Sequence, residues 1–207
     1  SINTVAMNFL SIDCSTDVSS LFVKIKNKTF SKNLQSYKSS NDLLMQQIID
    51  FFSTNNLKFD DISDIFVNQG PGNFSGTRGS LATAKGISLS KKLNLFGYDT
   101  FIWSCSKFFH INEPVYSLIK FREKYFIKKF DQNLTSGSKV QEIKIDEILK
   151  RYENFFKVIP KTMVDQFDEK ILKLSNINIA NLDHNELEFL KLKGLLDKDL
   201  IKPIYLS

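Results

Sequence analysis

Histidine and cysteine are both scarce in this chain of 207 residues, which has two of each. His110 and His184 form no HxxxH or HExxH pattern, and this argues against a zinc or iron site of the kind found in metallohydrolases. Cys14 and Cys105 form no CxxC pair, so we expect two buried thiols in a reducing compartment. The chain also lacks the GxSxG sequence of a serine nucleophile. We therefore predict neither a metal site nor a catalytic residue.

Long hydrophobic runs are also missing, since none approaches the roughly 18 residues that a membrane-spanning helix needs. The first eleven residues, Ser1–Ser11, contain no basic segment and no cleavage site of a secretion signal. Residues 1–6 precede the first methionine, Met7, and we interpret them as a leader or a cloning remnant. We expect a cytoplasmic protein that makes no membrane contact.

Neither charge sign is strongly in excess, because the chain contains 28 basic and 23 acidic residues and its net charge is +5. Lysines often stand beside Asp or Glu, which is typical of solvated faces. The densest basic stretch is residues 120–129, and one hypothesis is that Lys128 and Lys129 contact tRNA there. Its binding would then weaken steeply with salt.

Periodicity predicts a mixed α/β chain. Strands are expected at 9–12, 21–25 and 29–34, where they form an antiparallel meander, and a capped helix is expected over 40–52. Further strands are expected at 65–67, 95–98, 115–120, 124–130 and 176–180, with helices at 81–87, 104–109 and 146–152 and after the capping box that begins at Asp183. We predict an N-terminal subdomain at 7–110 and a smaller C-terminal subdomain at 111–207.

Five of the eight glycines fall between Gly70 and Gly86, directly after an apolar strand. Asn73 or Ser75 can cap the helix that follows, so the pattern predicts strand, glycine loop and helix. Such a loop can present backbone N–H groups to an anion or to a second polypeptide. It is not a Walker A sequence, because no Lys-Ser/Thr pair follows Gly76. A helix start contributes about 0.3 to 1 kcal/mol toward an anion, whereas micromolar binding needs about 8 kcal/mol.

Two helices carry unusual surfaces. The helix at 40–52 has one apolar stripe that Met45 and Ile49 widen, so it is either sandwiched inside its own domain or covered by another molecule. The helix after the glycine loop has small residues along one side, which permits close helix crossing within the chain or between chains. The candidate interface residues are Leu44, Met45, Ile48, Ile49, Phe52, Gly79, Ala82, Thr83, Gly86 and Ser90.

The glycine motif Gly70–Arg78 resembles the signature Gly-Pro-Gly-Ser-Phe-Thr-Gly-x-Arg of the TsaB family, also called YeaZ, of tRNA threonylcarbamoyladenosine biosynthesis. Weaker similarities occur in the same order as in the family, at residues 10–16, 84–87 and 203–207. Only Arg122 survives of the family's Asp-Ala-Arg at 120–122. Such proteins are also described as Gcp-like or M22 glycoprotease-like, although the chain shows no protease site.

The resemblance implies an actin-like ATPase fold of the ribonuclease H, sugar kinase and Hsp70 type, with a reduced second subdomain. It implies a non-catalytic partner of TsaD, without activity alone, in the threonylcarbamoylation of adenosine 37 of tRNAs that read ANN codons. The two helices would pair with TsaD, or with a second copy of the chain in isolation. TsaE would join the complex, whose substrate is tRNA, and ATP or ADP would bind near the shared interface rather than to the chain alone.

A nucleotide-binding role would involve the first phosphate turn at 13–16 as well as the glycine loop. An alternative function is therefore an independent nucleotide-dependent phosphotransferase, in which Asp13 coordinates the metal-nucleotide. A site shared with a partner, or a purely structural turn, explains the glycines better. The candidate nucleotide-binding residues are Asp13, Ser15, Thr16, Gly70, Pro71, Gly72, Asn73, Phe74, Ser75, Gly76 and Arg78.

Overall fold

The computed structural model describes residues 7–35 and 41–206, so the predicted leader at 1–6 and the start of the helix predicted at 40–52 lie outside the described residues. The chain divides into two compact units, Ser1–Asp99 with Leu196–Ser207, and Thr100–Leu195. The division differs from the predicted boundary after residue 110. The C-terminal residues belong to the first unit because the backbone of Asp197 pairs with that of Gly97 in both directions, at 2.8 and 2.9 Å.

The first unit contains a five-stranded sheet in the order β3-β2-β1-β4-β5. Its elements are β1 (Phe9–Asp13), β2 (Val18–Ile25), β3 (Lys28–Gln35), α1 (Asn41–Thr54), a 3₁₀ turn at Phe59–Asp61, β4 (Asp64–Asn68), α2 (Phe74–Lys91) and β5 (Asn94–Tyr98). Strands β1 to β3 form the predicted antiparallel meander, while β4 and β5 run parallel to β1. The glycine loop therefore follows the carboxyl end of a central strand.

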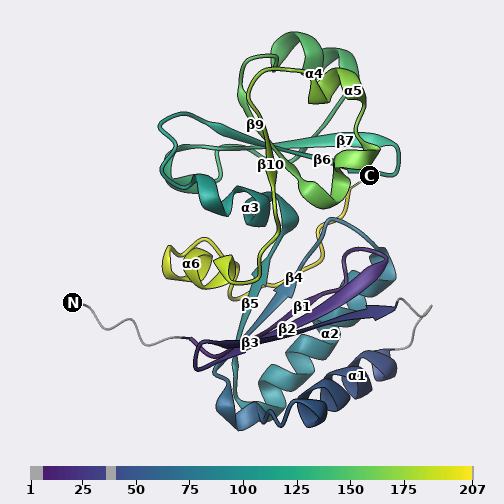
Figure 1. Ribbon diagram of the computed structural model, residues 1–207, viewed down its shortest axis with the longest axis vertical. Coiled ribbons are helices and arrows are strands. Elements are labelled where there is room, and N and C mark those ends of the chain that lie inside the picture. The colour runs from purple at the N-terminus through teal and green to yellow at the C-terminus, as the bar shows by residue number, and fades with distance from the viewer. Residues whose placement is uncertain (1–6, 36–40, 207) are drawn as a thin grey trace. The chain divides into compact units, whose positions relative to one another are not determined.

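Helices α1 and α2 lie next to each other along one face of this sheet (Figure 1). Alternate strand residues such as Leu10 and Ile12 point to the helices and join Ile48 and Leu81 in one buried core. The opposite face carries a row of phenylalanine rings from neighbouring strands, with centroids 4.9 to 5.8 Å apart. Apolar residues on both faces of β1 and β4 explain why these strands have near-continuous hydrophobic sequences.

The second unit contains another five-stranded sheet, in the order β10-β9-β6-β7-β8. Its strands are β6 (Val115–Phe121), β7 (Lys124–Phe130), β8 (Gln141–Ile143), β9 (Phe156–Pro160) and β10 (Ile177–Ala180). Its helices are α3 (Thr100–Cys105), α4 (Ile145–Arg151), α5 (Glu169–Leu172) and α6 (Glu186–Leu192), with 3₁₀ turns at Ser106–Phe108, Gln132–Leu134 and Lys161–Gln166. The helix predicted at 104–109 begins earlier, at Thr100, because a helix that is buried on every side shows no amphipathic period.

Helices α4 and α5 cover one face of the second sheet, and α3 and α6 lie on the other (Figure 1). Strand alternation distributes the basic stretch between these faces. Lys129 shares the α4 side with Ile127, whereas Lys128 points to the other side, where its ammonium lies 5.2 Å from the Phe130 ring centroid. Residues 120–129 therefore form no continuous basic surface. No helix within the described residues is both long enough and apolar enough to cross a membrane.

Candidate functional site

The candidate site begins at the end of β1, where Asp13 closes a tight turn. Its Oδ1 atom accepts hydrogen bonds from the backbone N–H of Ser15 at 3.0 Å and from the Ser15 hydroxyl at 2.6 Å. The amide of Asn68, at the end of β4, donates to the same hydroxyl at 3.3 Å. Thr16 is exposed, and its hydroxyl donates to the carbonyl of Val18 at 2.9 Å. The Asp13 carboxylate thus fixes the backbone of the turn.

The glycine loop is bound to this turn by further hydrogen bonds. The N–H of Gly70, whose φ is +104°, donates to the Asn68 side chain at 2.8 Å. The N–H of Asn73 donates to the carbonyl oxygen of Ser15 at 2.7 Å. The peptide bond between Gly70 and the buried Pro71 is cis. The two segments that sequence analysis assigned to nucleotide binding are therefore neighbours in the fold.

Two glycines of the loop are required by the closeness of these segments. A Cβ atom added at Gly72 would lie 1.9 Å from the carbonyl oxygen of Ser15. One added at Gly76 would lie 2.4 Å from the carbonyl oxygen of Cys14. No side chain fits at either position, because the loop packs directly against backbone. The spacing of the glycine motif is thus explained by contacts within the chain.

Asn73 caps helix α2, which confirms one of the two predicted caps. Its side-chain Oδ1 accepts from the N–H of Gly76 at 3.0 Å, and its carbonyl accepts from the N–H of Thr77 at 2.9 Å. The other predicted cap, Ser75, is exposed. Because these N–H groups, like those of Gly70 and Asn73, already donate within the protein, they are not available to cradle a phosphate.

An exposed aromatic cluster lies at the start of α2. The Phe74 side chain is 47% exposed and Tyr205 is 62% exposed, with their ring centroids 5.5 Å apart. The guanidinium carbon of Arg78 lies 5.0 Å from the centroid of the Phe74 ring. Aromatic and arginine side chains carry much of the binding energy at protein interfaces. These three side chains therefore give the glycine motif an outward surface that a partner can contact.

The C-terminal segment holds the other side of the loop. The side-chain amide of Gln69 donates to the Asp197 carboxylate at 3.1 Å and to the carbonyl of Lys202 at 3.0 Å. The N–H of Ile204 donates to the Gln69 carbonyl at 2.8 Å. Sequence analysis missed Gln69 and Asp197. The one available signal was that Gln69 directly precedes the glycine motif.

Most candidate interface residues of α1 pack against the core of their own unit. Ile48 and Phe52 are buried, while Leu44 and Met45 are partly buried against the same core. The segment after α1 covers what the sequence suggested was a surplus apolar side, because Phe59 stacks on Phe52 with ring centroids 4.3 Å apart. Ile49 does point outward and is 42% exposed.

The small residues of α2 do not form one accessible stripe. Gly79 and Thr83 are buried, whereas Ala82, Gly86 and Ser90 are exposed. A Cβ atom added at Gly86 would meet no other atom within 4 Å. Leu89, on the same outward side, is 80% exposed. The accessible part of the predicted interface therefore consists of the outer side of α2 together with Ile49 of α1.

Two buried ionisable side chains, Cys14 and Tyr98, lie near the β1 turn. Burial raises the pKa of the Cys14 thiol to about 11; a hydrogen bond with the Ser19 side chain opposes this shift, and the Asp13 charge adds to it. Burial also raises the pKa of Tyr98, whose hydroxyl lies 3.0 Å from that of Ser11. Both groups are protonated at neutral pH, so neither serves there as a nucleophile or general base. Within the described residues, no three His, Cys, Asp or Glu side chains come together in a metal-binding group.

Comparison with known proteins gives one relative by sequence. The tRNA threonylcarbamoyladenosine biosynthesis protein TsaB of Buchnera aphidicola subsp. Baizongia pistaciae (strain Bp) is 32% identical over 84 residues. The match covers 41% of this chain and 38% of that protein, so it spans well under half the length of the relative. No protein-family model matches the chain.

Two solved structures from Pseudomonas aeruginosa share the fold over nearly the whole chain. The first, an uncharacterized protein with similarity to peptidase YEAZ, has a TM-score of 0.69 at 12% identity and covers 98% of this chain and 100% of its own. The second, YeaZ, has a TM-score of 0.67 at 13% identity and covers 97% and 100%. These likenesses confirm the predicted mixed α/β fold, which this chain shares with both structures. Together with the sequence relative they confirm the resemblance to the TsaB/YeaZ family.

Proposed function

We infer, from a sequence and a fold that both support the TsaB/YeaZ family, that this chain takes part in tRNA threonylcarbamoyladenosine biosynthesis. The observation that carries the inference is the motif Gly70–Arg78 in its strand–loop–helix setting, locked onto the β1 turn. We propose the role of a non-catalytic subunit that pairs with TsaD during modification of adenosine 37 in tRNAs that read ANN codons. A binding role suits this site, because the N–H groups of Gly70 and Gly76 already donate hydrogen bonds within the chain and the buried Cys14 thiol is protonated.

The outer side of α2 and Ile49 of α1 form the proposed pairing surface. Leaving a large apolar side chain such as Leu89 in water forgoes about 1.5 to 3 kcal/mol of burial, which a docked helix would recover. Ala82 and Gly86 are small and exposed, so another helix backbone can approach closely between them. In isolation the same surface can pair with a second copy of the chain around a two-fold axis.

Nucleotide and TsaE enter this proposal at the shared interface. The glycine loop alone offers a weak anion site, because its N–H groups at residues 70, 73, 76 and 77 donate within the protein. Arg78 is exposed beside the loop and can supply a cation to an anionic group held mainly by a partner. We therefore propose that ATP or ADP binds at the glycine loop only in the assembled complex, and that the loop of the isolated chain binds neither.

The direct experiment combines the purified chain with TsaD and TsaE from the same organism. We expect a stable complex with TsaD, and threonylcarbamoylation of tRNA that requires this chain. Ala82→Trp and Leu89→Glu should each abolish co-purification with TsaD, while the circular dichroism spectrum and the melting temperature stay unchanged. Leu192→Glu is the matched control, since Leu192 is 67% exposed on a helix of the other unit. Absence of a complex with the unaltered chain, or full binding by both α2 variants, contradicts the proposal.

The alternative of an independent phosphotransferase has less support. The Oδ1 atom of Asp13, the proposed metal-nucleotide ligand, already accepts two hydrogen bonds from Ser15. Calorimetry of the isolated chain with ATP and magnesium separates the two functions. Micromolar binding that is lost in Asp13→Asn would favour the phosphotransferase, whereas the partner role predicts no Asp13-dependent binding without TsaD.

A further inference from the structure

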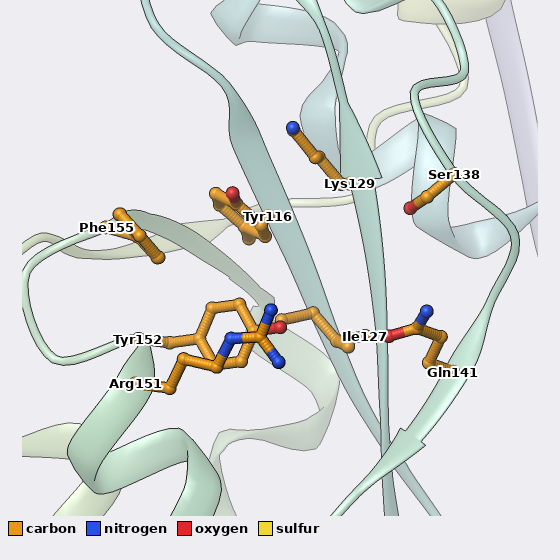
Figure 2. Close-up of a pocket in the computed structure, with 8 residues that line it drawn as sticks. All are labelled: Tyr116, Ile127, Lys129, Ser138, Gln141, Arg151, Tyr152 and Phe155. Carbon is orange, nitrogen blue, oxygen red and sulfur yellow. The ribbon is translucent and has the colours of Figure 1, made fainter.

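The second unit contains a pocket of about 260 Å³ on the face of its sheet that carries α4 (Figure 2). Sheet residues form its floor, and the end of α4 with the following loop forms one wall. The lining residues are Tyr116, Ile127, Lys129, Ser138, Gln141, Arg151, Tyr152 and Phe155. The pocket belongs wholly to this unit and shares no residue with the glycine loop.

Strand register brings the floor residues together. Tyr116 of β6 lies opposite Lys129 of β7, and Ile127 of β7 lies opposite Gln141 of β8. Since alternate residues of a strand point to the same face, Ile127 and Lys129 both face the pocket. None of these pairs is visible in the sequence, because they join three strands through their register.

Three aromatic rings make one side of the pocket. Tyr116 and Phe155 are nearly parallel, with 14° between their planes and 5.1 Å between their centroids. Tyr152 meets both edge-on, at 5.3 and 5.6 Å. Phe155 is 44% exposed, so part of this stack is open to solvent. An accessible aromatic stack is the kind of surface on which a planar heterocycle binds.

Two cations accompany the aromatic rings. The guanidinium carbon of Arg151 lies 5.5 Å from the Tyr152 ring centroid, and Figure 2 shows it in front of that ring, on the pocket side. Within residues 7–35 and 41–206 it has no ion pair with a carboxylate. The Lys129 side chain is 39% exposed, and its ammonium lies 3.8 Å from the Asp131 carboxylate. The pocket thus combines positive charge with aromatic surface.

The loop that carries Tyr152 and Phe155 is held by a buried lysine. The side chain of Lys157 is fully buried, and its ammonium donates to the carbonyl oxygens of Glu153 at 2.9 Å and Phe155 at 2.8 Å. It also donates to the carbonyl of Tyr152. A loop held at three carbonyls within four residues keeps the aromatic wall in place before a ligand arrives, which reduces the entropy lost on binding.

We propose that this pocket binds a nucleotide, with its base on the exposed aromatic stack and its phosphate between Arg151 and Lys129. An apolar ligand would leave the Arg151 guanidinium without a counter-charge, and a small inorganic anion would leave the aromatic wall unused. The volume suits a base and part of its ribose, with the phosphate at the mouth. The nucleotide can be a free mononucleotide or an unpaired residue of an RNA strand, because both present the same base and phosphate.

Calorimetric titration of the full chain with the 5′-ribonucleoside monophosphates tests the site. We expect saturable binding of at least one of them, with a dissociation constant below about 1 mM. The matching nucleoside and inorganic phosphate should each bind at least about tenfold more weakly, because each lacks half of the recognised groups. No saturable binding of any monophosphate or of an oligoadenylate up to about 5 mM would overturn the proposal.

Two variants connect binding to the pocket. Arg151→Gln and Phe155→Ala should each weaken nucleotide binding about tenfold, by removing a charge-assisted contact and a stacking surface. Lys150→Gln and Leu192→Ala are matched controls, since both residues are exposed in the same unit but outside the pocket. Arg151 is exposed, so its substitution should leave the fold intact. Binding that neither pocket variant weakens would mean a different site and would refute the inference.

A single-stranded oligoadenylate of about six nucleotides distinguishes the two sources of the ligand. If the pocket serves RNA, the oligonucleotide binds more tightly than AMP and loses affinity in the same two variants. Equal affinities would assign the pocket to a free nucleotide. None of these measurements uses TsaD or the modification reaction, so the inference stands or fails separately from the proposed function.

Discussion

Replacing Gly76 by alanine tests whether the glycines of the motif are required because the loop packs closely against the β1 turn. The added Cβ would lie 2.4 Å from the carbonyl oxygen of Cys14. Because a close carbon–oxygen contact is about 3.3 Å, the two backbone segments would have to separate by about 0.9 Å. Neither atom belongs to a flexible side chain, so the strain cannot be relieved by a change of rotamer.

The expected magnitude follows from three opposing contributions. Overpacking costs about 1 to 3 kcal/mol, and a weakened hydrogen bond between Asn73 and the N–H of residue 76 costs up to about 1 kcal/mol more. The gain in helix propensity from glycine to alanine is about 1 kcal/mol. We therefore expect a net loss of up to about 3 kcal/mol in the stability of the first unit. Gly86→Ala, in the same helix with open space around it, should instead stabilise by up to about 1 kcal/mol.

Native-state hydrogen exchange is the suitable assay, because the chain has two units and its single tryptophan, Trp103, lies in the second. Protection of core amides of β1 and β4, such as those of Leu10 and Ile65, reports on the first unit. Protection should fall in Gly76→Ala and rise in Gly86→Ala. If both substitutions raise protection equally, the loop does not pack on the β1 turn, and the packing explanation of the motif is refuted.

Two further predictions concern buried groups. Burial lowers the pKa of Lys157 to about 8, against the opposing charge of Glu153, so the unfolded chain binds more protons than the folded one between about pH 8 and 10.5. The free energy of unfolding of the second unit should therefore rise over that range by at most about 1.4 kcal/mol per pH unit, as followed by Trp103 fluorescence in urea. Lys157→Met should remove this rise. An identical pH dependence of unfolding in both proteins would contradict the prediction. Cys14 and Cys105 are both buried, so neither should react with a thiol-specific disulfide reagent within minutes at pH 8 in the native protein, whereas both should react in urea. Rapid labelling of the native chain would count against this burial.

Local sequence signals predicted those parts of the fold that depend on neighbours along the chain. The meander of β1 to β3 follows from alternating residues around a tight turn at Lys26 and Asn27, both of which have positive φ. The start of α2 follows from Asn73, whose side chain reaches an N–H only three residues away. The strand predicted at 65–67, before the glycine loop, is also present as β4, although its parallel pairing with β1 was not predicted.

Other predictions failed where a residue's surroundings come from distant segments. The sequence predicts helix α3 too late in the chain, because this helix is buried on all sides and shows no polar face. The apolar width of α1 leaves burial within the unit and cover by another molecule equally open from the sequence, and the structure shows that Phe59, which follows in a separate turn, covers Phe52. Periodicity along one helix shows which residues share a side, and it does not show which other element covers that side.

The sequence by itself determined that the loop at 70–78 needs glycine and that a capped helix follows it, because both depend on backbone conformation and on hydrogen bonds a few residues long. Only the tertiary structure decided why those glycines are required, since the answer is the carbonyl oxygens of Cys14 and Ser15, about sixty residues earlier in the chain. The pocket beside Phe155 likewise exists only once β6, β7 and β8 pair in register, because no local pattern records which side chains meet across strands.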